Sequence, residues 1–219
     1  MDNGEQMTDM PETSRRQALG HWLYRYRTWG LVPLFGIGLF MPIHEWPVRS
    51  GNFMMIAGAV GILFGTLLRI VCYRFTGSHD PMDVYDPSAM KTEGPYAITR
   101  NPVYMAEAAI ALGIAMMSRM PWFVLATLVV GGITTALVIQ WEETALLARY
   151  GEAYAQYCRT VPRWFSFRRI THRDAFALSR RRVKLLAAVR AESGTLLVGL
   201  LAILAFLAKA NLEMFYSGY

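Results

Sequence analysis

Charged residues are scarce in this chain, and cysteine is almost absent. Of the 219 residues, 17% are charged and 54% are hydrophobic, whereas soluble domains average about 25% charged and about 45–50% apolar residues. The two cysteines, Cys72 and Cys158, lie in an apolar run and in an arginine-rich segment, so we expect free thiols and no disulfide framework. The four histidines lie in separate segments without ligand-like spacing, and we expect no metal site.

Internal repeats and low-complexity tracts are also missing. Residues 1–27 are polar, and no short apolar segment with a small-residue cleavage site follows them. We therefore expect no cleavable signal peptide.

Long apolar runs replace the missing charge. A bilayer needs roughly 20 mostly apolar residues per helix, and five candidate segments are present: 28–43, 53–73, 103–117, 121–141 and 195–212. The third and fourth are separated only by residues 118–120, which predicts an antiparallel helical hairpin. A soluble helical core is disfavoured, because such helices rarely run this long without a polar face. The sequence predicts an all-α integral membrane bundle of about five transmembrane helices.

Lysine and arginine are distributed unevenly between the loops. Residues 1–27 carry four, 74–102 carry three and 142–194 carry eleven, whereas 44–52 and 118–120 carry one each. This excess predicts that the N-terminus and both long loops are cytoplasmic. The net charge of +6 is then explained by orientation, and we expect no nucleic-acid partner. The expected divisions are a cytoplasmic segment 1–27, a membrane core 28–167, a basic segment 168–194 and a C-terminal transmembrane helix 195–219.

The densest positive charge lies in residues 168–190, with three arginines in a row at 180–182. One interpretation is a surface helix on anionic lipid headgroups. The other is a dedicated site for a lipid phosphate.

The loop that precedes the third apolar segment carries the first polar motif, at residues 91–107. Asn101 is a good helix N-cap and Pro102 suits a first helical position, so a helix should begin there. Arg100, Asn101 and the free N–H groups could together hold a carboxylate or a phosphate; a simple cap with a snorkelling arginine is the alternative. Glu107 follows inside the apolar segment and should face a cavity or a cation; a solvated carboxylate at the membrane interface is the alternative.

The second motif follows the fourth apolar segment, at residues 141–164. We expect Glu142 and Glu143 to end that helix, where two carboxylates oppose the helix dipole. Their positive partner would be an arginine or a cationic ligand. A stripe of helical spacing follows, which fits packing or a ligand site: Leu146, Leu147, Tyr150, Tyr154 and Tyr157. Val161, Pro162 and Arg163 should end this helix, and the hairpin should make the two motifs spatial neighbours.

At these residues the chain resembles the isoprenylcysteine carboxyl methyltransferase and phospholipid methyltransferase superfamily. The matching residues are Gly94, Tyr96, Arg100, Asn101, Pro102, Tyr104, Glu142, Glu143, Leu146, Tyr150, Gly151, Tyr154, Tyr157, Val161, Pro162 and Arg163. The resemblance covers about residues 55–167. It implies a cytoplasmic pocket for S-adenosylmethionine, with a lipid tail that enters between helices.

The resemblance also implies roles for single residues. Cofactor contacts are expected from Tyr96, Asn101, Pro102, Val103, Tyr104, Glu142 and Glu143. Arg100 would orient a carboxylate, and Glu107 could accept a proton from an amine acceptor. Tyr157 and Arg163 are candidates for substrate binding.

Two departures bear on the acceptor. Position 101 is Asn, as in phospholipid N-methyltransferases, where the prenylcysteine enzymes carry His. Position 138 is Val, where eukaryotic prenylcysteine enzymes carry an arginine for the substrate carboxylate. Both departures favour a phospholipid headgroup over an isoprenylcysteine carboxylate.

Two other functions fit parts of the sequence. Membrane sterol reductases that use NADPH share an R-x-P-x-Y-x-x-E segment, which Glu107 completes, and a tail that Tyr157 and Cys158 match. They usually carry Arg-Asp in place of Glu142 and Glu143, and more membrane helices. A non-enzymatic membrane scaffold is the other alternative, although the cluster of ligand-like residues argues against it. The acceptor itself and the oligomeric state stay open.

Overall fold

The computed structural model describes residues 18–19, 22–23, 31–40, 48–77, 90–166 and 183–217. Its regular elements in these ranges are all helices: α2 (Leu31–Phe40), α3 (Val48–Thr76), α4 (Pro95–Ile98), α5 (Pro102–Met117), α6 (Pro121–Tyr150), α7 (Glu152–Thr160), α9 (Leu185–Ala191) and α10 (Ser193–Ser217). The prediction of an all-α fold is confirmed for this part of the chain.

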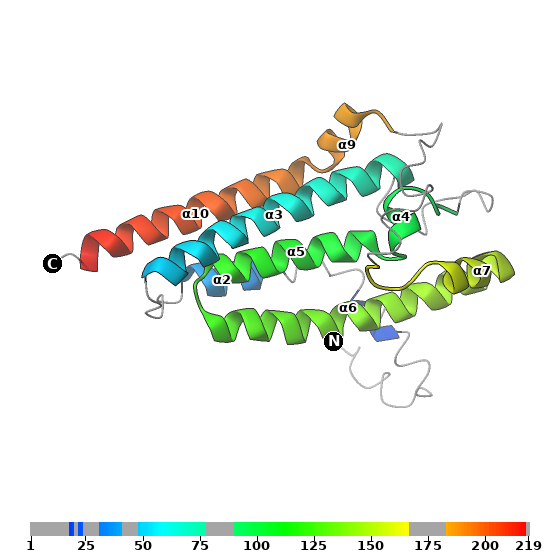
Figure 1. Cartoon of the computed structure of the whole chain (residues 1–219), viewed down its shortest axis with the longest axis horizontal. Helices are drawn as coiled ribbons and strands as arrows, with labels where there is room; N and C mark the ends of the chain where they lie inside the picture. Colours follow the sequence, from blue (N-terminus) through cyan, green and yellow to red (C-terminus); the bar gives the residue numbers. More distant parts are fainter. Residues whose placement is uncertain are drawn as a thin grey trace, which may run out of the picture.

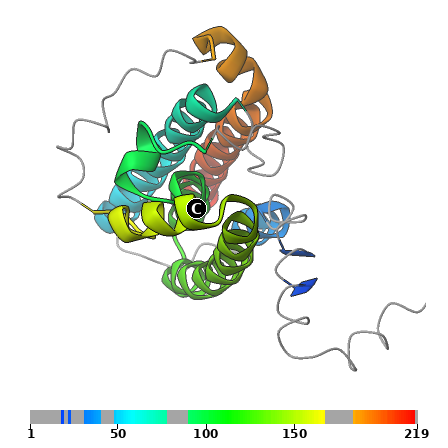
Figure 2. The same ribbon diagram turned by 90° about the vertical axis from the view of Figure 1, so that its right-hand side faces the viewer.

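Four long helices run alongside one another. In Figure 1, α10, α3, α5 and α6 lie in that order, and α3 contacts α5 and α10 while α5 contacts α6. The short helices α4, α7 and α9 gather at one end of these rods, and the last turn of α10 lies at the other end. The view along the rods in Figure 2 shows α7 lying across that end.

Three helices of the described ranges are long and apolar enough to cross a bilayer, namely Gly51–Thr76, Pro121–Tyr150 and Ser193–Leu212. The expected number of about five is therefore not confirmed. Helix α5 has 16 residues and α2 has 10, and both are shorter than the roughly 20 that a bilayer requires.

Helices α3 and α5 approach closely along a seam of small residues. A Cβ atom added to Gly58 would lie 2.5 Å from the carbonyl oxygen of Gly113, and one added to Gly65 would lie 2.5 Å from that of Ala106. Small residues allow helix backbones to meet in membranes, where packing rather than water drives association. The seam sets the position of α5 and therefore of the polar motif at its start.

Helix α6 continues beyond the paired glutamates, so the expected helix end at Glu142 and Glu143 is wrong. Residues 142–150 are mostly strong helix formers such as Glu, Ala and Leu. The helix ends at Tyr150, and Gly151 follows with φ 53°, a backbone conformation that glycine adopts readily. The stripe of tyrosines is accordingly divided between α6 and α7.

Helix α10 completes the apolar interior. Its Phe206 and Ala202 are buried with Ile62 of α3 and Ile114 of α5. Lys209 donates a hydrogen bond to the Gly38 carbonyl oxygen of α2 at 3.1 Å, one of the last carbonyls of that helix. Residues 195–212, which the sequence predicted as one apolar helix, thus lie within a longer helix that packs on α3.

Candidate functional site

The two polar motifs meet through backbone carbonyls. Asn101 donates its side-chain amide to the Arg163 carbonyl at 3.1 Å, and the Thr99 hydroxyl donates to the same oxygen at 3.0 Å. The Arg100 N–H donates to the Pro162 carbonyl at 3.0 Å. These bonds confirm that the two motifs are spatial neighbours.

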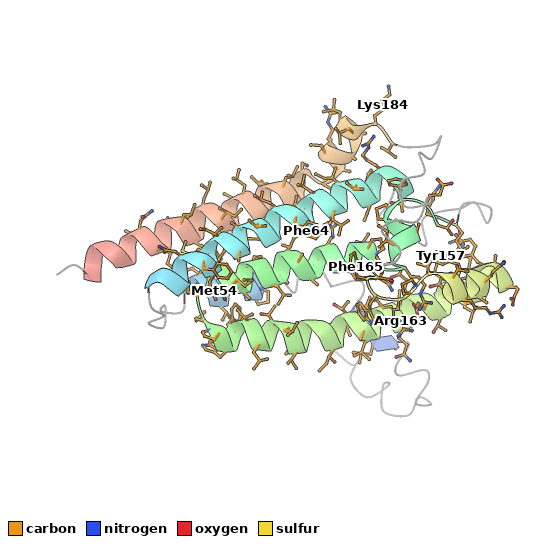
Figure 3. The ribbon with its side chains drawn as sticks, in the orientation of Figure 1. Met54, Phe64, Tyr157, Arg163, Phe165 and Lys184 are labelled. Atoms are coloured by element: carbon orange, nitrogen blue, oxygen red, sulfur yellow. The ribbon has the colours of Figure 1, made fainter. Side chains whose placement is uncertain are left out.

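A second joint links the motifs through a tyrosine. The Tyr157 hydroxyl of α7 donates to the Tyr96 carbonyl of α4 at 2.6 Å. Figure 3 shows Tyr157 and Arg163 at the end of the molecule where α4 and α7 lie. Both predicted substrate residues thus help to join the motifs, and their contact with a substrate stays a prediction.

Helix α5 begins at Pro102, as the sequence predicted, with Asn101 at the N-cap position. The Asn101 side chain does not cap the helix; its amide nitrogen instead donates to the Arg163 carbonyl. Pro102, Val103 and Tyr104 are all buried in the first turn. This start of α5 is therefore a fixed and enclosed part of the site.

Glu143 is held by two arginines. Arg163 binds it through two guanidinium nitrogens, and Arg100 Nη1 lies 3.4 Å from its Oε1 atom. The hydrogen bond to Glu143 raises the pKa of Arg163 above its ordinary value. An arginine partner, which the sequence left open beside a cationic ligand, is thus present for Glu143.

Glu142 has a different partner. The Tyr104 hydroxyl donates to its Oε2 atom at 2.5 Å, across the interface between α5 and α6. Glu142 is 9% exposed, and a buried carboxylate is costly unless hydrogen bonds or positive charge compensate it. The adjacent glutamates therefore have distinct environments.

An apolar cluster adjoins the Tyr104–Glu142 pair. Tyr104 packs with Val138 and Ile139 of α6, and Leu23 of the N-terminal segment packs against this cluster. Val138 and Glu142 are one helical turn apart, so they share a face of α6. A polar pair beside an apolar wall could serve a ligand that has a charged end and an apolar end.

Burial also affects two tyrosines outside the membrane-length part of the bundle. It raises the pKa of Tyr96 well above the usual value, with nearby acidic groups adding to the effect. Burial likewise raises the pKa of Tyr154, and the neighbouring Glu143 carboxylate adds to it. Both phenols are therefore neutral at physiological pH.

Arg100 carries a buried donor that its ion pair does not use. Within the described part of the chain, its Nε atom has no hydrogen-bond partner, and an unpaired buried donor costs about 1–3 kcal/mol. An amino-acid zwitterion has a carboxylate, which needs a donor such as Arg100 Nε, and an ammonium group, which needs an acceptor such as the Glu142 carboxylate. The residues present thus fit the carboxylate and the cationic groups of S-adenosylmethionine.

Glu107 lies one turn beyond Tyr104 but contacts a different helix. Its Oε1 atom lies 2.6 Å from Arg69 Nη1 of α3, which agrees with the expectation that it faces a cation. A second acid, Glu192, lies 3.0 Å from Arg69 Nε. The proton-accepting role of Glu107 stays a prediction.

Several of these residues escaped the sequence analysis. Arg69 could have been found, because an ionisable residue within an apolar run marks a functional or paired site. Thr99 and Leu23 carried no such signal, since their contacts depend on the arrangement of distant segments.

The basic segment is described only in part. Residues 168–182, with the arginines at 180–182, lie outside the described residues. Beyond them, Leu185 and Leu186 of α9 are exposed.

Comparison with known protein families supports the resemblance. Residues 53–153 match the family model described as phospholipid methyltransferase. This family belongs to the superfamily that the motifs resemble. No curated protein and no solved structure matches the chain.

Proposed function

We propose that this chain, whose residues 53–153 match the phospholipid methyltransferase family model, is an S-adenosylmethionine-dependent methyltransferase of the membrane. The observation that carries the proposal is the joining of the two motifs around Glu142 and Glu143. The family match covers all of the first motif and the glutamate pair of the second. The described part of the chain has three helices long and apolar enough to cross a bilayer, which fits a lipid-like acceptor.

The paired glutamates take different roles in this proposal. Glu143, held by Arg100 and Arg163, fixes the second motif to the first. Glu142, oriented by the Tyr104 hydroxyl, binds the cationic amino or sulfonium side of the cofactor. Arg100 Nε, a buried donor, binds the carboxylate. Tyr96, Asn101, Pro102 and Val103 form the surrounding wall.

The bound cofactor supplies an activated methyl group on a sulfonium. The protein must therefore align the acceptor with that methyl group and exclude water, more than provide acid–base chemistry. The buried start of α5 and the buried Glu142 serve both requirements. An amine acceptor must also lose a proton, and Glu107 is the candidate for receiving it.

The acceptor in our proposal is a phospholipid headgroup. Val138 is buried against Tyr104 and Ile139, which provides an apolar wall in place of an arginine that could meet a carboxylate. The matched family is described by the same substrate class. Asn101 contributes less to this choice than the sequence indicated, because its amide binds the Arg163 carbonyl.

The proposed orientation places the N-terminus and both motif loops in the cytoplasm, and the C-terminus on the opposite side. The lysine and arginine distribution supports it. A cysteine at Ser217 should react with an impermeant thiol reagent in intact cells. Reaction only after lysis would contradict this orientation.

The function is tested by incubating the purified protein with a labelled methyl donor and a total lipid extract. We expect label in a phospholipid with the wild-type protein and little label with Glu142→Gln. Label in a farnesylcysteine analogue and in no phospholipid would contradict the proposed acceptor. Failure to bind S-adenosylmethionine, together with binding of NADPH, would support the reductase instead; binding of neither would support a scaffold.

A further inference from the structure

A charged cluster lies among the helices beside the site and joins Glu107 of the first motif to two residues outside both motifs. Arg69 of α3 binds Glu107 of α5 through Nη1 at 2.6 Å and Glu192 through Nε at 3.0 Å. The side chains of Arg69, Glu107 and Glu192 are only 12%, 19% and 1% exposed. Glu192 lies between the end of α9 and the start of α10, so the cluster connects three parts of the fold.

Burying three charged groups is expensive, and simple packing does not require it. An apolar trio of similar volume is often as stable as a buried ion network, whereas loss of one member is strongly destabilising. The planar guanidinium offers several donors in a fixed fork, which lets one arginine hold two carboxylates in defined directions. The cluster therefore specifies an arrangement of helices more than it adds stability.

The arrangement that it specifies includes the start of α5. Glu107 follows Tyr104 by three residues, so one turn of helix separates the Arg69 contact from the Tyr104–Glu142 hydrogen bond. The first two turns of α5 are thus held from opposite helices, by Arg69 of α3 and by Glu142 of α6. A change at Arg69 should move Tyr104 relative to Glu142.

The cluster also reaches beyond the matched family core. Arg69 and Glu107 lie inside residues 53–153, and Glu192 lies outside them. A second contact supports this connection, because the Val183 N–H donates to the Arg74 carbonyl at 3.0 Å. Farther along, Gly199 of α10 lies against Ile62 of α3. The segment from residue 183 onward therefore packs against α3, the helix that carries Arg69.

We propose that Arg69 and Glu192 are positioning residues for the cofactor site. Arg69 fixes Glu107 and so fixes Tyr104 against Glu142, and Glu192 orients the Arg69 guanidinium. The C-terminal helices α9 and α10 are thereby coupled to cofactor binding. This inference rests on the proposed function of the Tyr104–Glu142 pair.

The test measures affinity for S-adenosylhomocysteine with purified full-length protein. We expect Glu192→Gln to weaken binding roughly fivefold, and the matched control Glu152→Gln, which changes an exposed ion pair, to leave it unchanged. Thermal unfolding of each variant shows whether it is folded at the assay temperature. Arg69→Lys keeps the charge but not the fork, so it provides a second, milder variant that should also weaken binding.

A double-mutant cycle separates positioning from general stability. If Glu192 acts through Tyr104, the effects of Glu192→Gln and Tyr104→Phe on affinity should be non-additive by roughly threefold or more. Additive effects, or wild-type affinity in both Glu192→Gln and Arg69→Lys, would overturn the positioning role alone. A wild-type protein that does not bind S-adenosylhomocysteine would overturn the proposed function, and the inference with it.

Discussion

The two ends of α5 are held in different ways. At its start, Asn101, Tyr104 and Glu107 each bind a polar partner on another segment. Toward its far end, Gly113 meets the backbone of Gly58 on α3 at close range, and apolar side chains pack beside it. The glycine contacts, which also occur near the start at Ala106, set how closely the helices pack, and the polar contacts at the start set the direction of particular side chains. We infer that function is concentrated at the start.

The largest effect should come from changing the far end. Gly58→Val would place a side chain 2.5 Å from the Gly113 carbonyl oxygen, and overpacking of this kind costs about 1–3 kcal/mol or more. We expect a lower unfolding temperature in detergent and a loss of cofactor binding that follows the loss of folded protein. Gly132→Val is the matched control, because nothing lies within 4 Å of a Cβ atom there. Equal stability of both variants would contradict the tight seam.

The next effect concerns the ion pairs that Glu143 forms with Arg100 and Arg163. Glu143→Gln leaves the partly buried Arg100 and the more exposed Arg163 without their carboxylate, and loss of one partner of such a pair costs about 1–3 kcal/mol. We expect reduced stability, measured by thermal unfolding, at low and moderate salt. Glu152→Gln should change stability by less than about 0.5 kcal/mol, since its ion pair with Arg159 is exposed. If the two variants behave alike, Glu143 does not join the motifs.

A smaller effect should appear at alkaline pH, through Tyr154 of α7 beside the start of α5. Burial raises the pKa of Tyr154 in the folded state above the unfolded value of about 10. Its contribution to stability is therefore complete below pH ~10 and is lost as the pH rises further, because the unfolded chain ionises first. As the pH rises from neutral into the alkaline range, the free energy of unfolding should fall less in Tyr154→Phe than in the wild type. Identical alkaline profiles would show that Tyr154 is not buried as described.

The sequence predicted the helical class and the start of α5 because local chemistry determines them. Asn101 and Pro102 mark a helix start in any context, and α5 does begin at Pro102. The end of α6 was placed too early, since apolar character ends near Trp141 while helix propensity continues to Tyr150. Hydropathy reports the membrane environment, and Gly151 determines where the helix stops.

The candidate site was predictable only in part. The paired motifs identified Glu142 and Glu143 and the need for positive partners. The contacts of Glu143 with Arg100 and Arg163, and of Glu142 with Tyr104, depend on side-chain directions that spacing does not determine. The Arg69–Glu192 pair joins residues 123 positions apart, and no local pattern connects them.

The most direct test of the account is a calorimetric titration of S-adenosylhomocysteine and of NADPH into dialysed wild-type protein and into Glu142→Gln. We predict that the wild type binds S-adenosylhomocysteine and not NADPH. We also predict that Glu142→Gln binds at least roughly tenfold more weakly, as expected for loss of a charged hydrogen bond, with an unchanged unfolding temperature. Wild-type affinity in Glu142→Gln, or a wild type that binds only NADPH, would contradict the account.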